Sequence, residues 1–450
     1  MILNNKISAQ VLSFLVSLIF TTVFSQNDFQ IDNDKGYFKQ EFKLINDLVI
    51  IPVQLNGREL SFLLDTGVNS TILFSITQED SSQVNNPTVV YLKGLGSDKP
   101  LRALKSNTNK LRVGEAFSSD QDIYLIEGKV FSISNRLGIP INGILGYDFF
   151  KDFVIEFNYK AKWMKVYDSK NYKYNRCSRC IEMPLKFYEK KPYIEAKVAI
   201  EEGKYEHVDL LIDSGSGDAL WLFKDPGNGL YIPEKSFKDF LGFGITGSVY
   251  GDRSRIKSLS LKDYSLKDIT VSFPDSLSLA AVNSFEERDG SIGAQVLKRF
   301  HSVFDYKRGS IRLKPNSNFR DSFEYNMSGI VIEHNGYRMF ENEIIPKSQF
   351  SIEYKTNDGV LNYSSDKKVN LLFSLEPSYE IAEVRPDSPA DLSGLQVGDE
   401  ILEINGRPVY RYSLKKINEI LSSKEGKKIK LEVLRFGVAL EIEFRLERIL

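Results

Sequence analysis

The sequence is poor in histidine, and this scarcity limits the chemistry open to it. Three histidines, His207, His301 and His334, are spread over 450 residues. The sequence contains neither a G-x-S-x-G nor an H-E-x-x-H motif, so serine hydrolase and zinc protease chemistry have no support. We interpret each histidine as a surface residue or a satisfied structural residue.

Cysteine is equally scarce. The two cysteines form a single pair, Cys177 and Cys180, within a polar stretch. A redox C-x-x-C belongs at the start of a helix that follows a strand, and a zinc site would need further ligands. The pair is therefore interpreted as a small local disulfide or as two inert thiols, and no metal or cofactor is expected.

An excess of one charge and a long apolar segment are also missing. The 59 basic and 60 acidic residues nearly cancel, so a nucleic-acid partner is not expected. The N-terminal apolar run, residues 11–20, is short for a membrane span of about 20 residues. Lys6 precedes it, Val23 and Ser25 suit cleavage before Gln26, and no lipid-anchoring cysteine follows. Residues 1–25 are thus predicted to be a cleaved signal peptide, and the mature protein to be exported (periplasmic or secreted) without a stable membrane anchor.

What the sequence does contain is one motif that occurs twice. The two copies are Phe62-Leu63-Leu64-Asp65-Thr66-Gly67 and Leu210-Leu211-Ile212-Asp213-Ser214-Gly215. Each is an apolar run that ends in Asp-Thr/Ser-Gly, which places a carboxylate at the end of a buried strand. A predicted hairpin precedes each copy, and the turn pair Asn56-Gly57 marks the first hairpin.

The surroundings of the two copies also match. An apolar segment ending in glycine follows each: Ile144-Leu145-Gly146 and, with a poorer first position, Ser291-Ile292-Gly293. Gly146 lies 81 positions after Asp65, and Gly293 lies 80 positions after Asp213. Two strands follow in both halves. The nearly equal spacing of matching segments in the two halves indicates an internal duplication.

These paired motifs resemble the pepsin/retropepsin-type aspartic proteases with both lobes on one chain. The resemblance covers roughly residues 44 to 315 and implies a mainly β, bilobal acid-protease fold. It implies that Asp65 and Asp213 form a catalytic dyad that shares one proton and activates water against a peptide bond, without metal or cofactor. Thr66 and Ser214 would brace the loops through their hydroxyls, and Gly67 and Gly215 would allow the loops to approach closely.

The residue after each motif differs. Val68 follows the first, whereas Ser216 follows the second, and its hydroxyl is placed to bond the carboxylate of Asp213. A hydrogen bond to the charged form lowers a pKa. We therefore predict that Asp213 carries the negative charge more often than Asp65 and that Ser216 is the cause.

Two glycine-rich segments are flap candidates. In the resembled family a hairpin closes over the substrate from the region that here holds Gly94 and Gly96. The second lobe has Gly244 and Gly247 in a comparable passage. That passage contains a G-x-G-x-x-G match, but neither a strand before it nor a helix after it is expected, so a dinucleotide site is not favoured.

The C-terminal part resembles a bacterial PDZ domain. The resemblance rests on Ser388-Pro389-Ala390, Gly394-Leu395, Gly398-Asp399 and Ile404-Asn405-Gly406. It implies a small β-barrel or sandwich with helices that binds a peptide C-terminus or an extended segment, with Gly329, Ile330 and Leu414 as candidate binding residues. Residues 333–375 read as an insertion within it.

The expected organisation is a first lobe (26–170), an inter-lobe linker with the cysteine pair (171–184), a second lobe (185–315), a linker (316–327) and the PDZ domain (328–450). The favoured function is an exported aspartic endopeptidase that acts on a peptide or protein substrate. The alternative is a catalytically inactive protease-fold/PDZ scaffold that only binds peptides. Intact aspartates in both motifs favour the enzyme.

Overall fold

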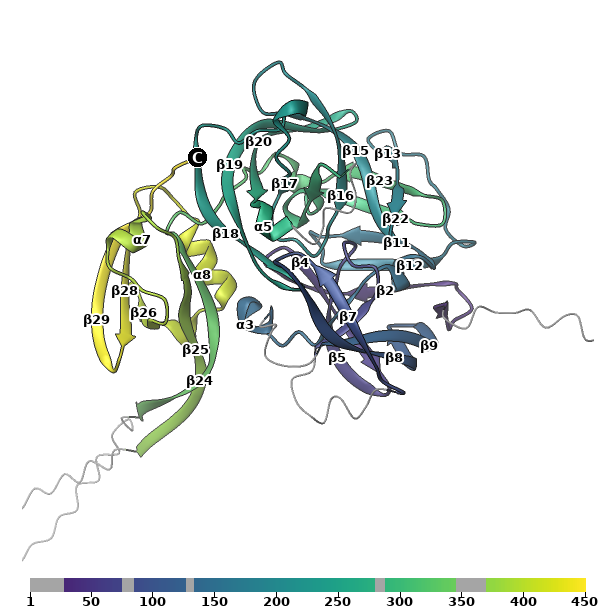
Figure 1. Cartoon of the computed structure of the whole chain (residues 1–450). Coiled ribbons are helices and arrows are strands. Elements are labelled where there is room, and N and C mark those ends of the chain that lie inside the picture. Colours follow the sequence, from purple (N-terminus) through teal and green to yellow (C-terminus); the bar gives the residue numbers. More distant parts are fainter. Residues whose placement is uncertain (1–27, 75–84, 127–132, 280–287, 345–369) are drawn as a thin grey trace, which may run out of the picture.

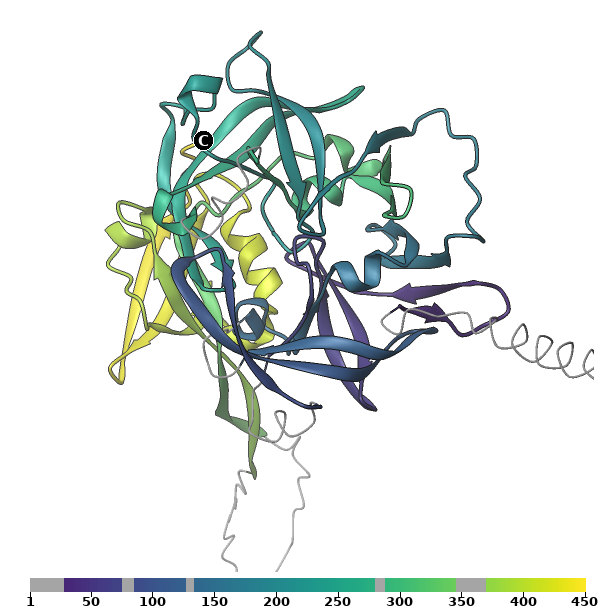
Figure 2. The ribbon, with the colours of Figure 1, turned by 45° about the vertical axis from the view of Figure 1, so that its right-hand side comes forward.

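The computed structural model describes residues 28–74, 85–126, 133–279, 288–344 and 370–450. The predicted signal peptide lies outside these residues. The expected mainly β architecture is confirmed: two lobes lie side by side, and a smaller β domain lies against them (Figure 1). Figure 2 shows the same arrangement turned by 45°.

The first lobe is built on one large sheet. The hairpin predicted around Asn56-Gly57 forms between β4 and β5, because both turn residues adopt the positive φ that a tight turn needs. In the described residues its order is β1-β9-β6-β10-β5-β4-β8-β7, with β3 beside β4. The strands are β1 (Gln30–Ile31), β3 (Lys43–Ile45), β4 (Leu48–Leu55), β5 (Arg58–Leu64), β6 (Thr71–Phe74), β7 (Thr88–Gly94), β8 (Ser97–Val113), β9 (Ala116–Ile126) and β10 (Gly143–Leu145).

The second lobe repeats this arrangement. Its described strands follow the order β14-β15-β16-β21-β17-β20-β19-β18. They are β14 (Lys186–Tyr188), β15 (Lys191–Ala199), β16 (Glu206–Ile212), β17 (Leu220–Leu222), β18 (Ser236–Gly244), β19 (Gly247–Leu261), β20 (Tyr264–Pro274) and β21 (Gly290–Ile292). The parallel pair β16–β21 is the counterpart of β5–β10 in the first lobe, as the duplication predicts.

A third sheet joins the two lobes. Its described strands run β13-β23-β22-β11-β12-β2, and β11 of the first half pairs with β22 of the second. They are β2 (Tyr37–Glu41), β11 (Phe153–Asn158), β12 (Trp163–Asp168), β13 (Ile181–Pro184), β22 (Phe300–Asp305) and β23 (Ser310–Pro315). Buried aromatic side chains pack under this sheet; Phe157, for example, makes an edge contact with Phe304. Both lobes therefore share one core.

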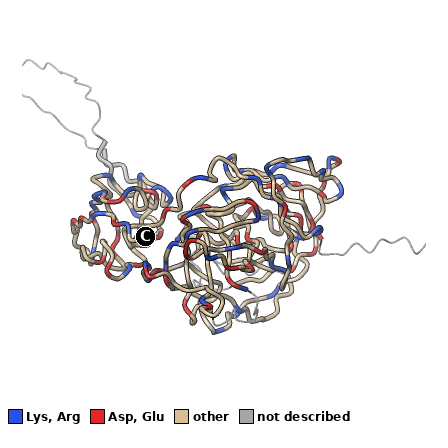
Figure 3. Tube along the Cα trace, turned by 90° about the horizontal axis from the view of Figure 1, so that it is seen from above, with Lys and Arg blue, Asp and Glu red and all other residues tan. Residues whose placement is uncertain are grey.

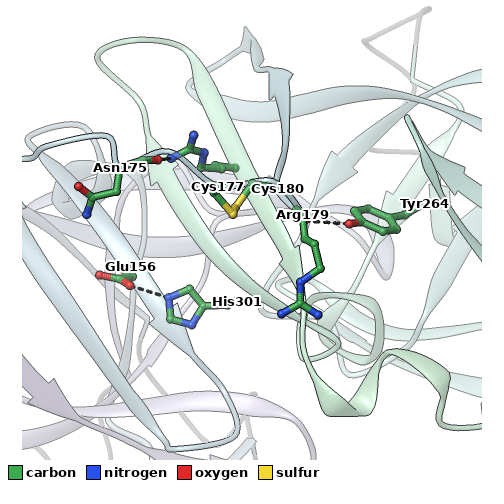
Figure 4. Close-up of a disulfide and its surroundings, with 8 residues drawn as sticks. Glu156, Asn175, Cys177, Arg179, Cys180, Tyr264 and His301 are labelled. Carbon is green, nitrogen blue, oxygen red and sulfur yellow. Dashed lines mark hydrogen bonds and ion pairs between the residues drawn. A yellow bond between two sulfur atoms is a disulfide. The ribbon is translucent and has the colours of Figure 1, made fainter.

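The crossing between the lobes contains the cysteine pair, which forms a disulfide (Figure 4). Neighbouring elements hold this segment just before the disulfide and within the loop that it closes. Tyr264 donates its hydroxyl to the carbonyl of Arg179 at 2.8 Å, and Arg312 donates to the carbonyl of Asn175 at 3.0 Å. The disulfide thus lies in a loop fastened to the second lobe and to the shared sheet.

The helices are short. They are α3 (Ile133–Leu137), α4 (Tyr147–Phe150), α5 (Ser276–Leu279), α6 (Ala294–Leu297), α7 (Pro389–Leu392) and α8 (Leu414–Leu421), with 3-10 turns η1 (Pro226–Asn228), η2 (Ser317–Arg320) and η3 (Val409–Arg411). Helices α4 and α6 occupy equivalent places after β10 and β21. In the described part of the chain, no helix is both long and apolar enough to cross a membrane.

The C-terminal domain has its own sheet and core. Its described strands run β24-β25-β26-β28-β29, with β27 beside β26. They are β24 (Ile330–Ile344), β25 (Asn370–Val384), β26 (Glu400–Ile404), β27 (Arg407–Pro408), β28 (Lys428–Arg435) and β29 (Val438–Arg445). Of the region predicted to be an insertion, residues 333–344 and 370–375 belong to the long β24–β25 ribbon, which extends away from the lobes (Figures 1 and 2), and residues 345–369 lie outside the described part.

The segment 316–327, expected to be a linker, is held firmly by both neighbours. Arg299, which is 1% exposed, donates to the carbonyls of Asn318, Asp321 and Ser322. Phe323 belongs to the core of the lobes, whereas Tyr325 and Met327, only a few residues on, belong to the core of the last domain. The C-terminal domain is therefore fastened against the lobes.

Charged residues of both signs are interspersed over the described surface (Figure 3). This distribution agrees with the near balance of 59 basic and 60 acidic residues.

Candidate active site

The two motif aspartates emerge from equivalent places in the two lobes. Asp65 follows β5 and donates its backbone N–H to the carbonyl of Leu145 in β10, at 3.0 Å. Asp213 follows β16 and donates to the carbonyl of Ile292 in β21, at 2.9 Å. Each loop is therefore anchored by the strand of its own lobe that the sequence identifies as its support. The poorer motif match at Ser291 does not disturb the second anchor.

Thr66 and Ser214 lock the two loops to each other. The hydroxyl of Thr66 donates to the carbonyl of Ile212 at 2.6 Å, and the hydroxyl of Ser214 donates to the carbonyl of Leu64 at 2.9 Å. Each hydroxyl also accepts the backbone N–H of the other residue, at 3.0 Å in both cases. The two side chains are buried. These four reciprocal bonds hold the two lobes in register at the level of the aspartates.

The adjacent glycines let the carboxylates meet. A Cβ atom built on Gly215 would lie 2.1 Å from Oδ2 of Asp65, and one built on Gly67 would lie 3.0 Å from the carboxyl carbon of Asp213. Each glycine also donates its N–H to the aspartate of its own loop, at 2.7 Å for Gly67 and 3.1 Å for Gly215. Any larger residue at position 215 would displace the opposing carboxylate.

The two carboxylates have unequal proton affinities. Burial, and next the negative charge of Asp213, raise the pKa of Asp65 to about 8. Burial raises the pKa of Asp213 as well, but the positive charge of Arg288 opposes this rise, as do the N–H of Gly215 and the charge of Lys191. Asp65 therefore binds a proton more strongly than Asp213, and when the pair holds a single proton, the charge lies on Asp213 and the proton on Asp65.

The charge lies where the sequence predicts, but the predicted cause is wrong. Among the described contacts, the hydroxyl of Ser216 makes no hydrogen bond to Asp213; only its backbone N–H bonds the carbonyl of that residue, at 3.3 Å. A Cβ on Gly293 would lie 3.1 Å from this hydroxyl, which therefore faces the supporting strand. The positive charges of Arg288 and Lys191, rather than the hydroxyl of Ser216, favour the ionised form of Asp213. No motif marks either residue in the sequence.

Two hairpins meet above the aspartates. The β7–β8 tip contains Gly94 and Gly96, and the β18–β19 tip contains Gly244 and Gly247. Thr246 joins them: its hydroxyl lies 2.9 Å from the carbonyl of Leu95 and 2.9 Å from the backbone N–H of Ser97, and its own N–H donates to the carbonyl of Leu95 at 3.1 Å.

Glycine is required at this meeting point. A Cβ on Gly244 would lie 1.9 Å from the carbonyl oxygen of Leu95, and one on Gly96 would lie 2.3 Å from that of Gly247. Gly96 also has φ +112°, which other residues rarely adopt. The glycines of the rejected dinucleotide motif thus lie at the tip of a second hairpin that meets the tip of the first; we refer to these two hairpins as the flaps.

The second flap also contacts the C-terminal domain. Tyr250 donates its hydroxyl to Glu383 at 3.1 Å, and the ring of Phe237 lies 5.7 Å from that of Tyr325. Arg136, in α3 of the first lobe, joins all three parts. It pairs with Glu333 of β24 at 2.9 Å, and its guanidinium lies 4.4 Å from the centre of the Phe243 ring.

One cavity of about 650 Å³ extends between the aspartates, the two flaps and the C-terminal domain. Gly329 and Ile330 line it, and so do Asn418 and Ser422 of α8. Leu414 does not: it is 2% exposed, belongs to the core of its domain and faces Gly138 after α3. Figure 1 shows α8 and α3 facing each other at this junction.

Two stretches of the chain match known protein families. Residues 51–149 match the family described as aspartyl protease, and residues 380–435 match the family described as PDZ domain. The chain carries an aspartyl protease domain and a PDZ domain. A solved structure, the aspartic proteinase from Irpex lacteus, is similar at 13% identity and a TM-score of 0.39, covering 64% of this chain and 99% of that one. No curated protein sequence matches the chain.

The aspartyl protease match covers most of the first lobe, and the second lobe repeats its key contacts. Sequence reasoning missed Lys191, Arg288 and Arg136. Lys191 stands in a charged turn, Glu189-Lys190-Lys191, that reads as a solvated loop. Only the pairing of β15 with β16 brings it to the aspartates: Tyr193 lies opposite Leu211, and the same register carried on by two residues places Lys191 beside Asp213.

Proposed function

We propose that the protein is an exported aspartic endopeptidase in which Asp65 and Asp213 activate a water molecule against a peptide bond. One observation carries this proposal: two carboxylates from duplicated loops meet in one cavity with unequal proton affinities. Such a pair supplies a base and an acid at the same pH.

The roles follow from the protonation of the pair. Ionised Asp213 takes a proton from the attacking water, while protonated Asp65 donates its proton to the carbonyl oxygen of the substrate. The tetrahedral intermediate then breaks at the C–N bond, as Asp213 passes the proton that it took from the water to the leaving amine. The flaps exclude bulk water, so the electrostatic interactions within the cavity are strengthened.

Export and peptide binding are parts of the same proposal. The N-terminal apolar run supports export, and the disulfide between Cys177 and Cys180 suits an oxidising compartment. In the described part of the sheet β24 pairs only with β25, and α3 of the first lobe lies against β24 through the Arg136–Glu333 ion pair. An extended peptide that adds a strand beside β24 therefore has to displace α3 from this strand. The start of this strand, at Gly329 and Ile330, opens on the catalytic cavity.

The decisive experiment measures cleavage of an unfolded protein and of a quenched peptide library by the mature protein from pH 3 to pH 10. We expect a bell-shaped profile whose alkaline limb lies near pH 8, because Asp65 loses its proton there. A statine-type transition-state mimic should inhibit. A folded protein that cleaves no peptide at any pH would contradict the proposal and favour a peptide-binding scaffold.

The position of the acid limb depends on the nearby cations. Replacing Lys191 by methionine removes a positive charge that favours ionised Asp213, so the pKa of Asp213 rises. We expect the acid limb of kcat/KM to move up by about 0.5–1 pH unit. Ser216→Ala is the matched control, and the acid limb of its kcat/KM profile should stay at the pH of the wild type. The opposite outcome, in which Ser216→Ala moves the limb and Lys191→Met does not, would restore the interpretation made from sequence.

A further inference from the structure

Two cations lie beside the catalytic carboxylates, although the water-activation chemistry needs no cation. Lys191 starts β15, and Arg288 lies just before β21. Strand β16, which leads to Asp213, runs between β15 and β21. Both side chains line the cavity that contains the two aspartates. Their charges act on each other, since Arg288 contributes to lowering the pKa of Lys191, so the two are neighbours.

Neither cation is neutralised by an ion pair within the described residues. Arg288 is 8% exposed; its Nε donates to the carbonyl of Gly290 at 3.2 Å, and its guanidinium lies 5.0 Å from the centre of the Phe223 ring. These neutral contacts do not balance its charge. Glu189 acts on Lys191, but its side chain is exposed and makes no ion pair with Lys191 in the described structure. A buried positive charge without a partner is unfavourable unless a ligand supplies one.

Asp213 alone does not balance the two cations. With Asp65 protonated, the aspartates carry one negative charge against two positive charges. Glu189 also lines the cavity and acts on Lys191, but it is exposed, so solvent screens its charge. The cavity therefore favours a substrate that brings a negative group to this side of the second lobe. Elsewhere in the cavity, comparable cations already have partners: Arg253 pairs with Asp218 at 3.0 Å and with Asp239 at 2.8 Å.

We propose that Lys191 and Arg288 form a subsite for a substrate carboxylate next to the scissile bond. This inference rests on the proposed peptidase function and specifies its substrate class: polypeptides with an acidic group close to the cleaved bond. The group is either an Asp or Glu side chain or the α-carboxylate at the end of the chain. In the bound state this carboxylate forms ion pairs with Lys191 and Arg288, as Asp218 and Asp239 do with Arg253.

The catalytic test uses matched quenched peptides with Glu or Gln at each position around the scissile bond, each with a free or an amidated C-terminus. We expect kcat/KM to be at least about tenfold higher for one Glu position, or for the free C-terminus, than for its neutral partner. In the Lys191→Met/Arg288→Met variant this ratio should fall below about three. A ratio between two substrates at one pH cancels the effect of the cations on the aspartates, so it isolates recognition.

A binding test separates this inference from the peptidase proposal. The Asp65→Asn protein is mixed with labelled Glu and Gln forms of the peptide, and their dissociation constants are compared by fluorescence anisotropy. The Glu form should bind at least about tenfold more tightly, whether or not the wild type hydrolyses peptides. Lys197→Met, an exposed lysine on the same strand β15, is the control and should keep the preference. Equal binding of the acidic and neutral peptides would overturn the proposal, and so would a preference that survives loss of both cations.

Discussion

Replacing Asp65 or Asp213 by asparagine is expected to reduce kcat/KM at least about 10³-fold. Asp213→Asn removes the base that accepts the proton of the attacking water, and Asp65→Asn removes the acid that protonates the carbonyl oxygen. The two losses should be far from additive, because the two carboxylates act as one unit. The measurement is kcat/KM on the best peptide at the optimum of the wild type, and the exposed Asp263→Asn is the control.

Of the two substitutions, Asp65→Asn should also stabilise the fold. The pKa of Asp65 is raised in the folded state from 3.8 to about 8, so at neutral pH folding must take up a proton. This contribution to stability is fully present below pH 3.8 and is lost as the pH rises through 8. Asn has no proton to take up, so Asp65→Asn should be more stable at pH 7 by on the order of 2–4 kcal/mol.

An inactive variant with a raised melting temperature would identify Asp65 as a residue kept for chemistry at the expense of stability. Two results would contradict this account: activity that survives in either variant, or inactivity accompanied by loss of the fold. The fluorescence of Trp163 and Trp221, one in the shared sheet and one in the second lobe, reports unfolding of both regions.

Thr66→Val is expected to give the second largest effect. Valine matches threonine in shape but removes the hydroxyl that donates to the carbonyl of Ile212 and accepts the N–H of Ser214. Both backbone groups would remain buried without a partner, which costs about 1–3 kcal/mol for each group. We expect a loss of about 2–5 kcal/mol in the free energy of unfolding, together with a drop in kcat/KM of about 100-fold in the protein that remains folded.

The matched control keeps the hydroxyl. Thr66→Ser should recover most of the activity, because its oxygen can make the same two bonds. Ser214→Ala should resemble Thr66→Val, since it removes the reciprocal bonds to Leu64 and Thr66. If Thr66→Val matched the wild type in unfolding midpoint and in kcat/KM, the four-bond network would have no role in holding the two loops together.

Repeated local patterns are what made the fold predictable. The Asp-Thr/Ser-Gly loops, the Asn56-Gly57 turn and the two apolar-apolar-glycine segments are written in contiguous residues. Their matched spacing was enough to predict both lobes and to name Asp65 and Asp213. The PDZ domain was equally readable from its short motifs.

What the sequence did not reveal depends on contacts between distant segments. Lys191 and Arg288 are separated by nearly 100 positions and meet only because β16 lies between β15 and β21. The hydroxyl of Ser216 was expected to reach the carboxylate of Asp213, but its rotamer points to Gly293, a choice that neighbouring backbone decides. The sequence predicts that Leu414 binds peptide, yet this side chain packs in the core of its own domain and faces Gly138. No local pattern encodes such packing.

The bonded tips of the two flaps bear on how a polypeptide enters the site. While Thr246 holds the carbonyl of Leu95 and the N–H of Ser97, the two hairpin tips form a bonded bridge of backbone along the cavity that contains the aspartates. A chain that is to enter from this side does so only after these bonds break. If the proposed peptidase activity holds, breaking these bonds is a step that precedes recognition of any substrate side chain, and the rate of cleavage depends on how easily the two hairpin tips separate.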